Sequence, residues 1–195
     1  MATALLKPDT RVKPTRAELV ACAGKSIRDV IAADLRVLFC GINPGLYSGW
    51  TGHHFAKPGN RFWPALYASG FTNRLLLPSE KHELLKSGYG ITNVIARTSA
   101  SETDLKRDEY AIGARRLQAK LHKYRPAFLA VLGIGAYRLA FEKPKAMLGR
   151  QEEKFGDTAV WVLPNPSGLN AHYQAKELAR LFRELREAVE SECRT

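Results

Sequence analysis

Cysteine and long hydrophobic runs are scarce in this sequence of 195 residues. Only Cys22, Cys40 and Cys193 occur, and their wide separation argues against a disulfide framework and against a CxxC-type metal or iron–sulfur site. No run of eighteen apolar residues is present, and the first residues lack the apolar stretch and cleavage site of a signal peptide. We therefore expect a soluble, bacterial-type cytoplasmic protein that inserts in no membrane and holds no metal.

Acidic residues are also in short supply, with 19 Asp and Glu against 30 Lys and Arg, for a formal net charge of +11. The imbalance is local as well, because the segment from Leu105 to Arg150 carries eleven basic and three acidic residues. This excess is larger than solubility requires, and it predicts a polyanionic partner such as nucleic acid or an anionic membrane surface. A solvated basic face without a partner is the alternative interpretation.

The pattern of apolar residues, which with Tyr, Trp and Cys make up 45% of the chain, predicts one α/β domain. Four short apolar segments have the character of strands, and they lie near residues 36–41, 90–95, 127–132 and 158–163. Helical spacing or capping residues occur between and around them, beginning at Thr15 and Asn60, over 78–88 and 106–124, and from Leu178 to Val189. Strands that alternate with helices predict a parallel sheet covered on both faces.

The domain organisation follows from the same pattern. Residues Met1 to Pro14 mix Lys, Pro and Thr without periodicity, so we expect a flexible arm there. We divide the chain into an N-terminal arm with a short helix, residues 1–35, and one catalytic domain, residues 36–195.

Two of the predicted strands end in similar loops. The first runs into Gly41-Ile42-Asn43-Pro44-Gly45, and the last runs into Pro164-Asn165-Pro166-Ser167-Gly168-Leu169. Because parallel strands present their carboxyl ends at one edge of a sheet, we expect both Asn-Pro corners at that edge, where open α/β folds bind ligands. Asn43 is the first candidate for chemistry, although an Asx-type turn would also explain an Asn at a strand-to-loop corner.

Two other features suggest weaker hypotheses. Gly133-Ile134-Gly135 follows a strand and opens a helix, as in dinucleotide-binding loops, but the third Gly and the later acidic residue are missing. His53 and His54 are adjacent in a Gly-rich loop and lack a third ligand, so they make a poor metal site.

Three motifs together carry a resemblance: Gly41-Ile42-Asn43-Pro44-Gly45, Asn60-Arg61-Phe62-Trp63 and Asn165-Pro166-Ser167-Gly168-Leu169. Between about Arg36 and Val189 the chain resembles the mismatch-specific uracil-DNA and thymine-DNA glycosylase family. The resemblance implies a three-layer α/β/α sandwich around a central four-stranded parallel sheet. It also implies a monofunctional glycosylase of base excision repair, which flips uracil or a related mismatched or damaged pyrimidine out of DNA and hydrolyses its N-glycosidic bond.

The resemblance has consequences for cofactors and partners. It implies a monomer without metal or cofactor that acts on double-stranded DNA with U:G or similar mismatches. Related glycosylases that carry an iron–sulfur cluster use four cysteines, and this chain has three.

The catalytic residues implied are Asn43 and Asn93. The amide of Asn43 can orient a water but cannot accept a proton at neutral pH, so we expect slower catalysis than with Asp at this position. Asn93 ends the second predicted strand at the same edge, where its amide could position the water or read the base.

The base-binding pocket implied consists of Ile42, Gly45, Phe55 and Asn165. The ring of Phe55 would stack on the flipped base, and the backbone N–H groups of Ile42 and Phe55 would reach the base edge.

The DNA contacts implied involve Ser48, Ser167, Gly168, Leu169 and Asn170, with Gly168 and Leu169 as the wedge that fills the gap left by the flipped base. Lys57 and Arg61 could meet phosphates, although Arg61 could instead pair with an acid inside the fold. The sequence Asn170-Ala171-His172 has no Arg where some relatives contact the orphaned base. We therefore expect broad substrate use that includes U:A pairs and single-stranded DNA.

Two alternatives to a glycosylase stay open at this point. The chain could recognise uracil or mismatched DNA with little turnover, because Asn43 is a weak catalyst. It could also be an α/β enzyme that binds nucleotides at the Gly133 loop.

Overall fold

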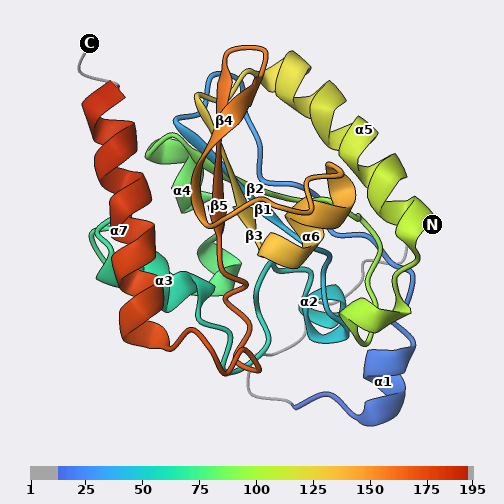
Figure 1. Ribbon diagram of the computed structural model, residues 1–195. Helices are drawn as coiled ribbons and strands as arrows, with labels where there is room; N and C mark the ends of the chain where they lie inside the picture. The colour runs from blue at the N-terminus through green and yellow to red at the C-terminus, as the bar shows by residue number, and fades with distance from the viewer. Residues whose placement is uncertain (1–12, 193–195) are drawn as a thin grey trace, which may run out of the picture.

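The computed structural model describes residues 13–192, so most of the predicted N-terminal arm lies outside the described residues. A single mixed sheet forms its centre, with strand order β2-β1-β3-β5-β4 (Figure 1). The first four of these strands are parallel, and they are β1 (Val37–Gly41), β2 (Tyr89–Asn93), β3 (Phe128–Leu132) and β5 (Thr158–Leu163). The four predicted strands are confirmed to within two residues at each end.

Alternation along β1 divides the core into two layers. Val37 and Phe39 point into a cluster on one face of the sheet, whereas Leu38 and Cys40 point into a cluster on the other. Burial of Cys40 raises the pKa of its thiol, so this cysteine behaves as a small apolar residue. Because side chains on both faces of β1 are buried, its sequence is a continuous hydrophobic run.

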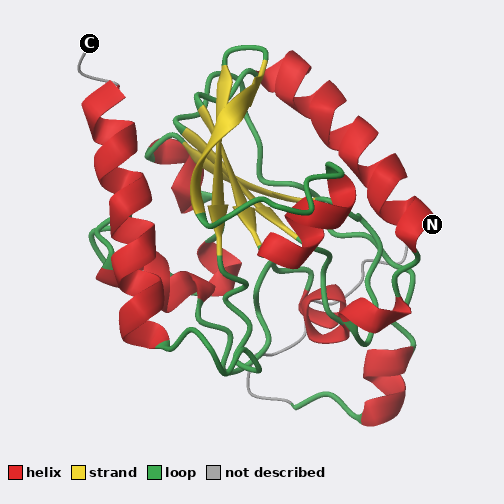
Figure 2. Cartoon of the chain, in the orientation of Figure 1, coloured by secondary structure: helices red, strands yellow, loops and turns green. Residues whose placement is uncertain are grey.

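Helices cover both faces of the sheet (Figures 1 and 2). One face carries α3 (Phe62–Ala68), α4 (Glu83–Lys86) and α7 (Ala175–Glu192), and the other carries α5 (Arg107–Tyr124) and α6 (Ile134–Ala140). Phe182 of α7 stacks on Phe39 of β1 with ring centroids 6.1 Å apart. The three-layer α/β/α architecture is therefore confirmed.

The sheet differs from the prediction in having a fifth strand, β4 (Gly149–Phe155), which pairs antiparallel with β5 at one edge. This strand has the sequence Gly-Arg-Gln-Glu-Glu-Lys-Phe, and its residues alternate between half-buried and exposed. Its polar composition hides it from a search for apolar runs. Charged residues on an edge strand also discourage pairing with other chains.

Most predicted helices are confirmed, with changes at their ends. α1 (Arg16–Val20) begins after a capping box in which Glu18 pairs with Thr15. α3 begins at Phe62 with Arg61 at its N-cap, one residue later than the predicted cap Asn60, whose side chain accepts the Phe62 N–H at 2.9 Å. The single helix predicted over 78–88 is partly wrong, because this segment divides into a 3₁₀ turn, Pro78–Glu80, and the short α4.

The segment before β1 is part of the same fold. Val30 is buried and exchanges backbone hydrogen bonds of 2.9 and 2.7 Å with Ile91 of β2. Asp29 lies 2.5 Å from the ammonium of Lys120 and also accepts a hydrogen bond from Thr92. None of the helices among residues 13–192 has the length and apolar character needed to span a bilayer.

Candidate functional site

A cavity of about 430 Å³ opens at the carboxyl ends of β1, β2, β3 and β5. This volume lies in the range of about 300–1,000 Å³ that is usual for ligand pockets. All but one of the predicted site residues line it; they are Ile42, Asn43, Gly45, Ser48, Phe55, Asn93, Asn165, Ser167, Leu169 and Asn170. Gly168, the exception, belongs to the same loop as its neighbours Ser167 and Leu169. The sheet edge expected to hold the site is therefore the edge that holds this cavity.

Asn43 is fixed through its amide nitrogen. Nδ2 donates to the hydroxyl of Ser99 at 2.8 Å, to the carbonyl of Arg97 at 3.1 Å and to the carbonyl of Pro44 at 3.2 Å. Because Nδ2 is held by these three oxygens, the orientation of the amide is fixed. Its oxygen remains available as a hydrogen-bond acceptor at a half-buried position on the cavity wall. An acceptor held in one orientation is suited to aligning a water molecule.

Asn93 and His54 form a largely buried pair on the cavity wall. His54 is 2% exposed, and its Nε2 lies 3.0 Å from the carbonyl of Arg28, so that nitrogen carries the proton. Nδ1 is then the acceptor for Nδ2 of Asn93 at 3.3 Å. Burial lowers the pKa of His54 to about 4, which keeps the ring neutral at physiological pH. The tautomer of His54 therefore fixes Asn93 with its amide oxygen free to accept.

Gly41 allows Asn93 and Phe55 to come close to the end of β1. A Cβ at Gly41 would lie 2.5 Å from Oδ1 of Asn93 and 3.1 Å from the ring of Phe55. Any side chain at this position would displace one of the two groups. Gly41 is therefore needed because Asn93 and Phe55 occupy the space of a side chain, and not because the backbone turns there.

Phe55 has an unusual backbone conformation, with φ of +54°. Such a conformation costs on the order of 1–3 kcal/mol for a residue other than glycine, so neighbouring contacts must hold it. The Phe55 ring stacks on Phe62 with centroids 4.1 Å apart, and the indole N–H of Trp63 donates to the carbonyl of His54 at 3.1 Å. The hydroxyl of Ser48 accepts the N–H of Ala56 at 3.3 Å.

Ser48, which the resemblance implies as a phosphate contact, is 4% exposed in α2 (Leu46–Thr51). Its hydroxyl therefore supports the loop of Phe55 at the cavity wall. Lys81 supports the same loop, because its ammonium donates to the carbonyl of Gly52 at 2.6 Å. Partial burial lowers the pKa of Lys81.

The loop after β5 carries the predicted wedge. Asn165 accepts the N–H of Ser167 at 3.0 Å, and its carbonyl accepts Nδ2 of Asn170 at 2.9 Å. Leu169 stands at the tip with 82% of its surface exposed. Its side chain is therefore accessible to a partner that approaches the mouth of the cavity.

The wall also includes Lys57, which the sequence suggested as a phosphate contact. Several other residues of the wall were not predicted as site residues, among them His54, Asn60, Ser99, Ser101, Glu102 and Leu132. Ser99 and Ser101 belong to the polar loop after β2, where the sequence shows no distinguishing pattern. Glu102 is the single carboxylate on the cavity wall within residues 13–192. It accepts a hydrogen bond of 3.3 Å from the hydroxyl of Tyr110.

The Gly133 loop makes a strand-to-helix turn. Gly133 has φ of +138°, and its N–H donates to the carbonyl of Leu163 at 2.8 Å. A Cβ there would lie 3.1 Å from the side chain of Ile42. Backbone geometry and close packing therefore explain this glycine without a nucleotide.

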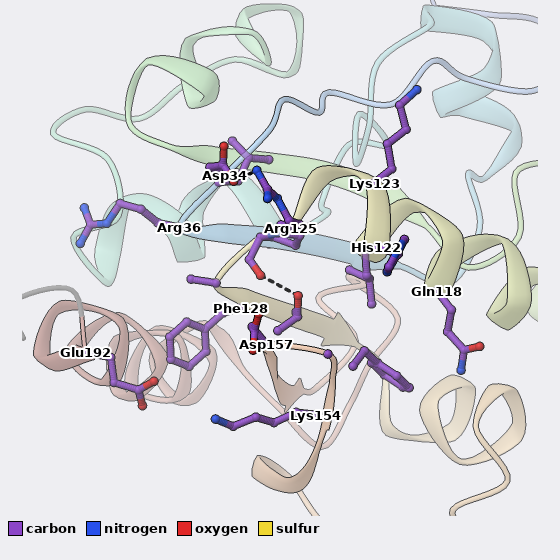
Figure 3. Close-up of a pocket in the computed structure, with 17 residues that line it drawn as sticks. Asp34, Arg36, Gln118, His122, Lys123, Arg125, Phe128, Lys154, Asp157 and Glu192 are labelled. Atoms are coloured by element: carbon purple, nitrogen blue, oxygen red, sulfur yellow. Dashed lines mark hydrogen bonds and ion pairs between the residues drawn. The ribbon is translucent and has the colours of Figure 1, made fainter.

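A larger cavity, of about 1230 Å³, lies at the opposite edge of the sheet (Figure 3). It is bounded by Arg36, Phe128 and Thr158, at the amino ends of β1, β3 and β5. Arg125 and Asp34 pair on its wall at 3.3 Å. Residues 13–192 hold no group of three or more His, Cys, Asp or Glu side chains that could bind a metal ion.

The comparisons with known proteins agree with this geometry. Residues 28–189 match the family described as the uracil DNA glycosylase superfamily, and the match begins before Arg36. Among solved structures, the chain is similar to the solution NMR structure of a proposed uracil DNA glycosylase from Methanosarcina acetivorans. The TM-score is 0.55 at 17% sequence identity, and the alignment covers 84% of this chain and 98% of the other. That similarity supports the fold, while the family match extends over most of the chain. The chain therefore belongs to the uracil DNA glycosylase superfamily.

Proposed function

We propose that this protein is a monofunctional uracil-DNA glycosylase that flips uracil out of mismatched DNA and hydrolyses its N-glycosidic bond, leaving an abasic site. The observation that carries this proposal is that one cavity is lined by both the fixed amide of Asn43 and the ring of Phe55. Membership of the superfamily supports uracil in DNA as the substrate. Action on U:G mismatches and on related damaged pyrimidines, and function as a monomer, belong to the proposal.

The mechanism assigns the nucleophilic water to Asn43. The bond between C1′ and N1 of uracil lengthens, the sugar gains oxocarbenium character and the departing base gains negative charge. The electron pair of the C1′–N1 bond leaves with uracil, the water held by Oδ1 of Asn43 adds to C1′, and the proton that this water releases passes to the uracil anion or to solvent. Asn43 cannot take a proton, and His54 is buried with both ring nitrogens in hydrogen bonds. These residues therefore align the attacking water without acting as a strong base.

Asn93 is proposed to read the base. Its amide oxygen, left free by the hydrogen bond to His54, can accept N3–H of uracil, whereas the N3 of cytosine has no hydrogen to donate. The ring of Phe55 stacks on the flipped base, and such stacking contributes about 1–3 kcal/mol. The N–H groups of Ile42 and Phe55 are proposed to stabilise the negative charge on the base.

The wedge is proposed to be Gly168 and Leu169, with Ser167, Asn165 and Asn170 at phosphates or the opposite strand. Leu169 is followed by Asn170-Ala171-His172, without the Arg that contacts the orphaned base in some relatives. We therefore propose that contact with the orphaned guanine is weak and that the protein also accepts U:A pairs and single strands. Activity confined to U:G would contradict this part of the proposal.

The experiment that tests the function is single-turnover excision from labelled oligonucleotides that contain U:G, U:A, T:G or single-stranded uracil. Asn43→Ala is expected to lower the rate at least about tenfold, which corresponds to about 1.4 kcal/mol of transition-state stabilisation. Asn73→Ala, a change at an exposed Asn away from the cavity, is the matched control and should leave the rate unchanged. Equal rates for the native chain and Asn43→Ala would move the water-binding role to another residue.

A second candidate is a uracil- or mismatch-binding protein with little turnover. It is favoured by the uncharged amide at position 43, since binding and stacking do not require a base catalyst. Tight binding to U:G duplexes without excision by the native chain would support this candidate over the glycosylase.

A further inference from the structure

Arg61 holds the loop that carries Leu169. Its Nη1 donates to the carbonyls of Asn170 at 2.9 Å and Tyr173 at 2.8 Å, and its Nη2 donates to the carbonyl of Gly168 at 3.2 Å. The backbone N–H of Arg61 donates to the carbonyl of Pro166 at 2.9 Å. One residue thus contacts four carbonyls on both sides of the exposed leucine.

The partners of Arg61 within residues 13–192 are backbone carbonyls, and none of the described carboxylates forms an ion pair with it. The acid inside the fold that the sequence offered as its partner is therefore not found among these residues. Only a planar guanidinium presents several donors in a fixed fork, so one side chain can fix carbonyls that point in different directions. A lysine would keep the charge and lose this geometry.

Arg61 also lies between the loop and the base pocket. Asn60 lines the cavity and accepts the N–H of Phe62, the first residue of α3, and Phe62 stacks on Phe55 with centroids 4.1 Å apart. Three consecutive residues therefore support the pocket wall, the loop after β5 and the helix between them. The position of Leu169 relative to the ring of Phe55 therefore depends on residues 60–62.

We propose that Arg61 is a positioning residue that presets the wedge, so that Leu169 enters the duplex at a fixed distance from the pocket. The inference rests on the proposed function, because a wedge is needed only if a base is flipped. It predicts a defect that is specific to paired substrates: a uracil that is already unpaired leaves no stacked pair to open.

Gly168 provides an independent way to disturb the same loop. A Cβ at this position would lie 2.5 Å from the carbonyl oxygen of Gly59 and 3.1 Å from its carbonyl carbon. Gly168→Ala is therefore expected to shift the loop that carries Leu169 away from Gly59, while Arg61 keeps all of its hydrogen-bond donors. If the position of the loop is what matters, both variants should share one pattern of defects.

The test compares excision from a U:G duplex with excision of uracil from a single-nucleotide bulge and from a single strand. Arg61→Lys and Gly168→Ala should each lose at least about tenfold in single-turnover rate on the duplex and less than about threefold on unpaired uracil. Arg138→Lys is the matched control, because Arg138 also donates to a carbonyl, that of Ala146, and lies outside the cavity wall. It should behave as the native chain does on all substrates.

A double-mutant cycle separates positioning from general damage. In a Leu169→Ala background the wedge is already lost, so Arg61→Lys should cost less than about twofold more on the duplex. Equal losses on duplex and unpaired uracil, or full additivity with Leu169→Ala, would overturn the inference, since either result means that Arg61 supports the pocket or the whole fold.

A binding signal distinguishes failure of this inference from failure of the proposed function. 2-Aminopurine next to the uracil brightens when the base pair opens, whether or not the bond is cleaved. Native protein that brightens the probe without excising uracil would contradict the proposed enzyme, and loss of that signal in Arg61→Lys would still support the inference. Absence of brightening with the native protein, or an undiminished signal in Arg61→Lys, would overturn it.

Discussion

Acidification should destabilise this protein through one buried histidine. His54 is neutral in the folded state, with a pKa lowered to about 4 by burial, whereas its ordinary value is 6.5. Between these two values the unfolded chain binds a proton that the folded chain does not, so stability rises with pH across this window. The contribution is fully present above pH 6.5 and is lost as the pH falls toward 4.

The magnitude follows from the difference between the two pKa values. A difference of about 2.5, at 1.36 kcal/mol per pH unit, corresponds to about 3 kcal/mol. His54 is 2% exposed, so solvent screening does not reduce this figure greatly. Protonation of the folded state, which occurs near pH 4 and below, would also place a donor of His54 against the amide nitrogen of Asn93 and disrupt the base-reading geometry.

The assay is urea unfolding of the native chain and His54→Gln at pH 7, 6, 5 and 4. Between pH 7 and 4, the native chain should lose about 3 kcal/mol more of its free energy of unfolding than the variant does. His122→Gln, at an exposed position of α5, is the control and should follow the native curve. If His54→Gln loses stability as steeply as the native chain, the assignment of a buried neutral imidazole is refuted.

Other changes test the closeness of packing around the site and the domain boundary. Gly41→Ala should lower uracil excision at least about tenfold, because its Cβ would lie 2.5 Å from Oδ1 of Asn93; Gly135→Ala, where no atom lies within 4 Å, should leave excision unchanged and raise the free energy of unfolding by up to about 1 kcal/mol. A chain cut to residues 36–195 should lose about 3 kcal/mol or more of its free energy of unfolding in urea, because it lacks the buried Val30 and the Asp29 partner of Lys120; stability equal to that of the full chain would support the boundary predicted at residue 36.

Local patterns were sufficient to predict the parallel strands and the long helices. The segment before Asn43 is apolar throughout because β1 is buried on both faces, and this burial leaves a clear signal in the sequence. β4 left no such signal, because an edge strand half exposed to solvent tolerates the charged sequence that it has. The motifs around Asn43 and Asn165 likewise identified the sheet edge that bears the cavity.

The sequence by itself determined the fold class, the working edge of the sheet and most of the residues on the cavity wall, since each depends on short-range pattern or on a local motif. Only the tertiary structure decided how those residues are held. The tautomer of His54 depends on its contact with the carbonyl of Arg28, and the orientation of the Asn43 amide depends on its hydrogen bond to the carbonyl of Arg97. The position of Leu169 depends on the hydrogen bonds that Arg61 donates to carbonyls of the same loop. Each of these contacts joins a side chain to a backbone carbonyl from a distant part of the chain. Every residue has such a carbonyl, so no pattern of side chains can reveal which one will be bound.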